Sequence, residues 1–128
     1  MNIDLFIKSY MRTALWAETD NADDSGGEPL DQNYRLSDIA GKTYTRMRHE
    51  AEDFVFYNID DLNLLLAQGF DEETAGACFW LNRNGHGTGF WDRNLGELGE
   101  RLDKASELAG EVSLYVGDDG KIYQMGAE

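Results

Sequence analysis

Residues 78–93 read Cys78-Phe79-Trp80-Leu81-Asn82-Arg83-Asn84-Gly85-His86-Gly87-Thr88-Gly89-Phe90-Trp91-Asp92-Arg93. Aromatic pairs flank a glycine-rich centre, and Asn84-Gly85 readily adopts the positive φ angles of a tight type I′ turn. The pattern predicts a β-hairpin in which residues 79–81 face residues 90–91, with one aromatic of each pair directed into the core. Charged side chains near the strand ends would then pair across the hairpin, namely Arg83, Asp92 and Arg93.

A second hairpin is predicted near the end of the chain. Residues 113–116 and 121–124 flank Gly117-Asp118-Asp119-Gly120, a four-residue connection with glycine at both ends. Two hairpins joined by a helix predict an α+β fold with an antiparallel sheet of about four strands, against which the N-terminal helices pack. A chain of 128 residues is expected to form one domain, residues 1–128.

The helices are predicted from apolar residues at three-to-four-residue spacing and from capping residues. An amphipathic helix is expected over residues 4–17, beginning at Asp4, and the longest helix from Ser37 or Asp38 to Tyr57. A short helix after Asn58 or Asp60 would end at Gly69, because glycine suits the left-handed position that terminates a helix. Further helical segments are a single turn at residues 71–73 and a helix over residues 94–110, in which Asn94 and Glu97 would form a capping box.

The charge of the chain restricts its partners. Twenty-five acidic residues against 11 basic ones give a formal net charge of −14, while 41% hydrophobic and 12% aromatic residues indicate a folded protein and not an acidic tail. Direct nucleic-acid binding is disfavoured, because affinity for the phosphate backbone comes largely from Lys and Arg. The acidity fits either solubility alone or an acidic, DNA-mimicking surface that binds a basic groove of another protein.

The cysteine count and the first residues of the chain indicate its cellular location. Cys78 is the only cysteine, so no intrachain disulfide can form, which fits a reducing cytoplasm. The first residues lack a basic segment followed by an apolar run, and no run approaches 18 apolar residues. We therefore expect a cytoplasmic protein that is neither exported nor membrane-spanning.

Two segments supply the acidic side chains that we expect to contact a partner. One is the aperiodic loop over residues 18–34 and the other is the helix over residues 94–110. The loop lacks the Asp-x-Asp-x-Asp-Gly spacing of a calcium site, so no metal and no cofactor is expected. The candidate partner-binding residues are Asp20, Asp23, Asp24, Glu28 and Asp31 of the loop with Glu97, Glu100, Asp103 and Glu107 of the helix.

Residues 78–93 also contain the residue types of an active site. Cys78, His86 and Asp92 resemble a nucleophile, base and orienting acid, but Cys78 would lie roughly 25 Å from His86 along an extended strand. The glycines around His86 resemble a phosphate-binding loop, although such loops run from a strand into a helix. A ligand pocket at the Asn84–Gly89 turn therefore stays as an alternative, with Arg83, Asn84, His86, Asp92 and Arg93 as its candidate residues.

The same residues carry a resemblance to a known family. The phrase FWLxRNGHGxGFWDR over residues 79–93, together with LYVGDDGKIY over residues 114–123, resembles a family of small acidic proteins encoded by phages and other mobile elements. The likeness extends to residues 10–16 and 28–31, so it covers nearly the whole chain. It implies an accessory gene of a phage and no particular reaction.

These observations lead to two hypotheses from different classes. The first is a non-enzymatic phage or mobile-element protein in the host cytoplasm that binds a basic host protein, such as a defence complex of the CRISPR or restriction type. The alternative is an enzyme or small-ligand-binding protein in which His86 acts as acid or base and Arg83 or Arg93 holds an anion.

Overall fold

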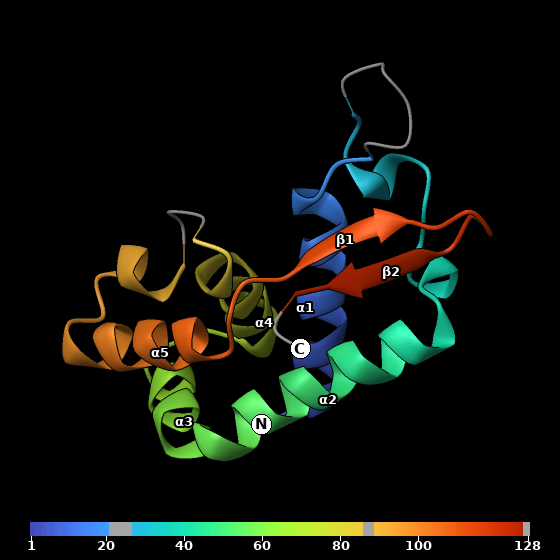
Figure 1. The fold of residues 1–128 in the computed structure, drawn as a ribbon. Coiled ribbons are helices and arrows are strands. Elements are labelled where there is room, and N and C mark those ends of the chain that lie inside the picture. Colours follow the sequence, from blue (N-terminus) through green and yellow to red (C-terminus); the bar gives the residue numbers. More distant parts are fainter. Residues whose placement is uncertain (21–26, 86–88, 127–128) are drawn as a thin grey trace.

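The computed structural model describes residues 1–20, 27–85 and 89–126, without the side chains of Trp91 and Asp92. In this part of the chain, α-helices pack around one hydrophobic core and a two-stranded sheet lies across one end of them (Figure 1). The fold is therefore α+β, as predicted. The helices are α1 (Ile3–Ala17), α2 (Gly41–Tyr57), α3 (Ile59–Ala67), α4 (Glu72–Arg83) and α5 (Glu97–Leu108), and the strands are β1 (Ser113–Val116) and β2 (Ile122–Met125).

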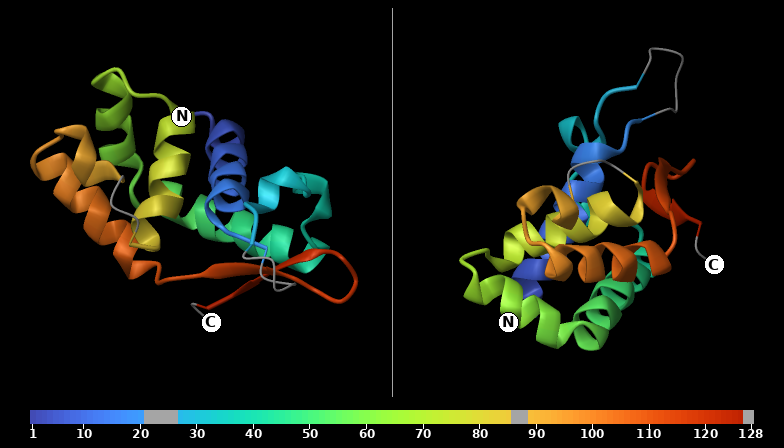
Figure 2. Two further views of the ribbon diagram at one scale, coloured as in Figure 1. Left: turned by 90° about the horizontal axis from the view of Figure 1, so that it is seen from above. Right: turned by 90° about the vertical axis from the view of Figure 1, so that its left-hand side faces the viewer.

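Helices α1 and α4 lie side by side and run in the same direction (Figure 2). The backbone N–H of Asn2 donates to Glu72 Oε2 at 2.9 Å where both helices begin. Farther along, a Cβ atom built on Gly76 would lie only 2.3 Å from the carbonyl oxygen of Phe6. The glycine therefore permits the close approach of the two helices, since any side chain at this position would push them apart.

A stack of aromatic rings occupies the space between α1, α2 and α4. The Phe79 ring of α4 lies at its centre, with centroid distances of 4.0 Å to Phe54 of α2 and 4.9 Å to Tyr10 of α1. Phe6 and Trp80 extend the stack, and all five side chains are buried. Large aromatic rings bury more apolar area per residue than other side chains, so this stack forms the main stabilising contact of the helical part.

The C-terminal hairpin is confirmed. Strands β1 and β2 pair antiparallel, from Ser113 opposite Met125 to Val116 opposite Ile122. The loop between them closes with a hydrogen bond from Gly117 N–H to the Lys121 carbonyl at 2.8 Å. The Ile122 carbonyl also accepts from Ala40 N–H at 2.9 Å, directly before α2 begins. This contact attaches the hairpin to the helical part.

The hairpin predicted over residues 78–93 is wrong. Cys78–Arg83 form the second half of α4, and Phe90–Arg93 form a short 3-10 helix, η3. Asp71 caps the N-terminus of α4, since its side chain accepts from Thr74 N–H at 2.8 Å, and the predicted single turn at residues 71–73 is therefore the start of a full helix. The sheet accordingly has two strands in the described residues and not about four.

The reason for this error is burial on every side of the helix. All six side chains from Cys78 to Arg83 are buried, so the polar face that normally reveals a surface helix is missing. Asn84-Gly85 ends the helix instead of forming a hairpin turn: Gly85 has a φ of 71°, and its N–H donates to the Asn82 carbonyl at 3.2 Å.

The other predicted helices are present with shifted boundaries. Asn2, not Asp4, caps α1 through its side chain, and the residues predicted to start the longest helix form the 3-10 helix η2 (Leu36–Asp38) before α2. Gly69 ends α3 with a φ of 98°, as expected. The capping box proposed for Asn94 and Glu97 does not form, because Asn94 is left-handed and Gly96 occupies the cap position. Within the predicted acidic loop, Leu30–Gln32 form the 3-10 helix η1.

Candidate functional site

Arg83, a candidate for binding an anion, is engaged within the protein. Its side chain has 0% exposure. The guanidinium donates from Nε to the Gly110 carbonyl at 2.8 Å, from Nη1 to the Tyr10 hydroxyl at 2.7 Å and from Nη2 to the Ala109 carbonyl at 2.8 Å. Nη2 also lies 3.4 Å from Glu50 Oε2. These contacts hold Arg83 in a structural role and leave it unavailable to a ligand.

Asn84 is likewise engaged. Its Nδ2 donates to the Trp80 carbonyl at 3.0 Å, and its Oδ1 accepts from Val112 N–H at 2.8 Å. A pocket of about 390 Å³ lies beside it, with Glu18 and Glu111 among its lining residues. These carboxylates would repel an anionic ligand.

The remaining candidate pocket residues are only partly described. Arg93 is exposed on η3 and lies near the thiol of Cys78, whose pKa is raised by burial and thereby kept in the inert protonated form. His86 and the side chain of Asp92 lie outside the described residues. Among the candidates that the structure does describe, Arg83 and Asn84 serve the fold.

The predicted partner-binding acids fall in two separate places (Figures 1 and 2). Glu97, Glu100 and Glu107 are exposed on α5, where Asp103 is half-buried and makes contacts of its own. The loop after α1 lies elsewhere on the molecule; it contributes Glu28 and Asp31, which are exposed, and Asp20, which is half-buried. Asp23 and Asp24 lie outside the described residues. One surface therefore cannot include both groups, and of the two only the acids of α5 lie on an α-helix.

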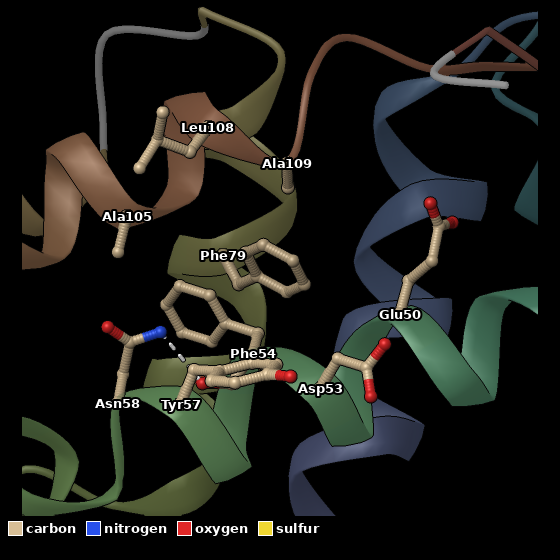
Figure 3. Close-up of a pocket in the computed structure, with 9 residues that line it drawn as sticks. All are labelled: Glu50, Asp53, Phe54, Tyr57, Asn58, Phe79, Ala105, Leu108 and Ala109. Atoms are coloured by element: carbon tan, nitrogen blue, oxygen red, sulfur yellow. Dashed lines mark hydrogen bonds between the residues drawn. The ribbon is translucent and has the colours of Figure 1, made fainter.

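A groove that sequence reasoning missed lies between α2 and α5 (Figure 3). It has a volume of about 400 Å³. The stacked rings of Phe54 and Phe79 form its floor. Tyr57 at the end of α2 and Leu108 at the end of α5 stand at its sides with exposures of 78% and 88%. The lining residues are Glu50, Asp53, Phe54, Tyr57, Asn58, Phe79, Ala105, Leu108 and Ala109.

Two carboxylates of α2, Glu50 and Asp53, stand at the rim of the groove (Figure 3). Glu50 is held by the interior: its Oε1 accepts from Gln124 Nε2 at 2.7 Å and lies 4.0 Å from Arg46 Nε, while its Oε2 faces Arg83. Asp53 is exposed and makes no hydrogen bond or ion pair with any described residue. Asp53 is therefore a negative charge available to a ligand.

Buried beneath this rim, Tyr10 completes a polar network with Arg83 and Glu50. Burial raises the pKa of the Tyr10 hydroxyl to about 12, so the phenol stays neutral over the physiological range and accepts from Arg83. The network fixes Glu50 at the groove, because the carboxylate has partners on α4 and β2. One rim charge is thus held in place and the other is free to pair.

The described part of the chain contains no group of three or more His, Cys, Asp or Glu side chains that could bind a metal ion. None of its helices combines the length and the apolar composition that a membrane crossing requires. The arrangement that the structure does provide is an apolar floor with exposed hydrophobic sides and an acidic rim. Such a groove is suited to an apolar group that carries a positive charge beside it.

One sequence signal pointed to this groove. Phe56 and Tyr57 are adjacent at the end of α2. Adjacent side chains of a helix point in different directions, so at least one of the two aromatics is expected outside the buried stripe. In the structure both are largely exposed. The other parts of the groove come from α4 and α5, and only the tertiary packing brings them together. Comparisons with protein-family models, with curated proteins and with solved structures find no match to this chain.

Proposed function

We propose that this chain is a non-enzymatic accessory protein of a phage or mobile element that binds a basic surface of a host protein. The partner class is a nucleic-acid-binding defence complex of the CRISPR or restriction type, which the protein inhibits in the host cytoplasm by occupying the groove that receives nucleic acid. The resemblance in sequence supplies the phage setting, and the charge supplies the mode of binding.

The observation that carries the proposal is the excess of exposed carboxylates. The net charge is −14, and Arg46, Arg48, Arg83 and Arg101 already lie within 4.0 Å of carboxylates of the same chain. On α5, Glu97, Glu100 and Glu107 stay exposed on a rigid helix. Fixed negative charges of this kind attract a basic groove at long range and reproduce the electrostatics of a phosphate backbone.

The alternative of an enzyme or small-ligand site at the Asn84–Gly89 turn has less support. The polar groups of Arg83 and Asn84 form hydrogen bonds within the protein. The pocket beside Asn84 has two carboxylates among its lining residues. An anion at this position would need a cation that these residues do not supply.

The test is inhibition of purified defence complexes. We expect the protein to displace labelled DNA from at least one CRISPR effector or restriction enzyme, with an affinity that falls as salt rises. Neutralising three acids of α5, by Glu97→Gln, Glu100→Gln and Glu107→Gln together, should weaken inhibition about tenfold or more.

The matched control removes the same charge elsewhere, through Asp4→Asn, Glu73→Gln and Asp118→Asn, all at exposed positions. We expect this control to weaken inhibition less than about threefold. The proposal fails if no defence complex is inhibited and phages carrying the gene gain no plating advantage on hosts with active defences. It also fails if both triple variants lose affinity equally, because the charge would then act without a defined surface.

A further inference from the structure

We infer that the groove between α2 and α5 receives a basic apolar segment of a partner protein: an amphipathic helix that inserts a large hydrophobic side chain and places an arginine or lysine against Asp53 and Glu50. This inference rests on the proposed function, since it names the part of the partner that this protein holds. The groove is lined by Ala105 and Leu108 of α5 and by Ala109, which follows this helix, but not by Glu97, Glu100 or Glu107.

The two sides of the groove carry large apolar side chains that face water. Tyr57 and Leu108 belong to different helices, yet both are lining residues of the same groove and both leave most of their apolar surface in water. Phe56 lies next to Tyr57 with its ring 5.3 Å away and is also exposed. Exposed large apolar side chains gathered at a concave surface indicate a contact site for another molecule.

The charge of the rim selects the occupant. The groove is lined by two carboxylates, and no lysine or arginine is among its described lining residues. Asp53 has no hydrogen-bond or ion-pair partner in the described part of the chain, and the Arg83 guanidinium that faces Glu50 is engaged in interior contacts. An acidic or purely apolar segment in the groove would remove water from the Asp53 carboxylate without providing a positive charge in its place. An arginine or lysine would pair with this carboxylate.

The dimensions favour a helix with one or two anchor residues. A volume of about 400 Å³ accepts a large side chain and its neighbour, but not a folded element. The groove lies between two helices, with a floor of stacked rings, which is the setting in which amphipathic helices bind through residues at i, i+3 and i+4. A second copy of this chain is a poor occupant, because its own charge is −14.

The test uses a fluorescein-labelled, alanine-based peptide of about 15 residues, near the length at which such helices become stable. It carries Leu and Phe four positions apart and two arginines on the adjoining turn. A second peptide replaces both arginines by glutamate, and a third replaces Leu and Phe by alanine. Binding to the full-length protein is followed by fluorescence anisotropy, and sedimentation velocity reports the oligomeric state.

We expect the arginine peptide to bind and the other two to bind at least about tenfold more weakly. Leu108→Gln should lower the affinity about tenfold, and Asp53→Asn about three- to fivefold. Two variants serve as matched controls: Leu64→Gln on α3 changes an exposed leucine, and Asp118→Asn changes an exposed aspartate in the loop between β1 and β2. Neither should change the affinity by more than about twofold.

The inference is overturned if the arginine peptide does not bind at about 1 mM, or if it binds the Asp53→Asn, Leu108→Gln double variant as tightly as the parent. It is also overturned if the protein is a dimer that Leu108→Gln dissociates, since a second copy would then occupy the groove. The two proposals fail separately. If the peptide binds but no defence complex is inhibited, only the proposed function fails. If a defence complex is inhibited equally by the parent and by the double variant, only the inference about the groove between α2 and α5 fails.

Discussion

Arg83 and Arg101 each meet a carboxylate from another helix, but in opposite surroundings. Arg101 of α5 holds Asp61 of α3 with two nitrogens at 2.9 and 3.1 Å, and its side chain is 49% exposed. Arg83 approaches Glu50 only to 3.4 Å and has 0% exposure. The surface pair has the better geometry, yet water and salt weaken it. The solvent around an ion pair, more than the distance between its charged atoms, therefore decides how much the fold depends on that pair.

Removing the buried guanidinium should have the largest effect. Arg83→Met deletes the charge and removes the donor of Glu50 Oε2, of the Tyr10 hydroxyl and of two backbone carbonyls. We expect a loss of about 3–5 kcal/mol in the free energy of unfolding, measured by urea denaturation. Arg101→Met is the matched control. A loss below about 1 kcal/mol for Arg83→Met would mean that the interior network is dispensable.

Raising the pH should produce the next effect. The Tyr10 pKa is about 12 in the folded protein, above its ordinary value of 10, so the unfolded chain releases this proton first as the pH rises. The stabilisation is complete below pH 10 and is lost between pH 10 and about 12, at a cost of roughly 2–3 kcal/mol. The measurement is urea denaturation across this range. The Tyr10→Phe protein should show a shallower decline, and equal slopes in both proteins would contradict the prediction.

A smaller cost is expected for Tyr10→Phe at neutral pH. Phenylalanine keeps the ring contacts with Phe79 and Trp80 but removes the acceptor for Arg83 Nη1. A buried donor without a partner costs about 1–3 kcal/mol, again measured as the free energy of unfolding. A neutral result would indicate that Nη1 finds another acceptor, which a structure of the variant would reveal.

The smallest effect is expected at the surface pair. Arg101→Ala should lower the free energy of unfolding by about 0.2–1 kcal/mol, and 1 M salt should remove most of the difference from the parent. The same salt should leave the loss in Arg83→Met nearly unchanged, because solvent does not reach that site. A salt response that is equal at the two sites would refute the comparison.

The predictable parts of the fold are those in which one face meets water. Helices α1 and α5 bury one stripe of side chains, and β1 and β2 alternate between buried and more exposed positions, so the spacing of apolar residues shows them in the sequence. The second half of α4 is enclosed on all sides and offers no such period. The aromatic pairs and glycines of residues 79–91 resemble the pattern of a β-hairpin, and the sequence therefore predicts two strands more than the described part of the chain has.

The candidate site was harder to predict, because its residues acquire their roles only through packing. Arg83 looks like a surface cation in the sequence, but its acceptors lie 73 residues earlier and 27 residues later. The groove needs Phe79 of α4 beneath side chains of α2 and α5. Only the acids of α5 could be placed in advance, since their helix is amphipathic and its polar face is exposed.

The order of protein synthesis gives the buried network a further consequence. Tyr10, Glu50 and Arg83 are synthesised before Ala109 and Gly110, whose carbonyls accept from Arg83, and Gln124 can reach Glu50 only after 74 more residues have been made. Until then a nascent chain holds a guanidinium that is only partly paired, so burying it is unfavourable. We therefore expect the helical core to close only once the C-terminal hairpin is available, so that the hairpin and the helices fold in one cooperative step.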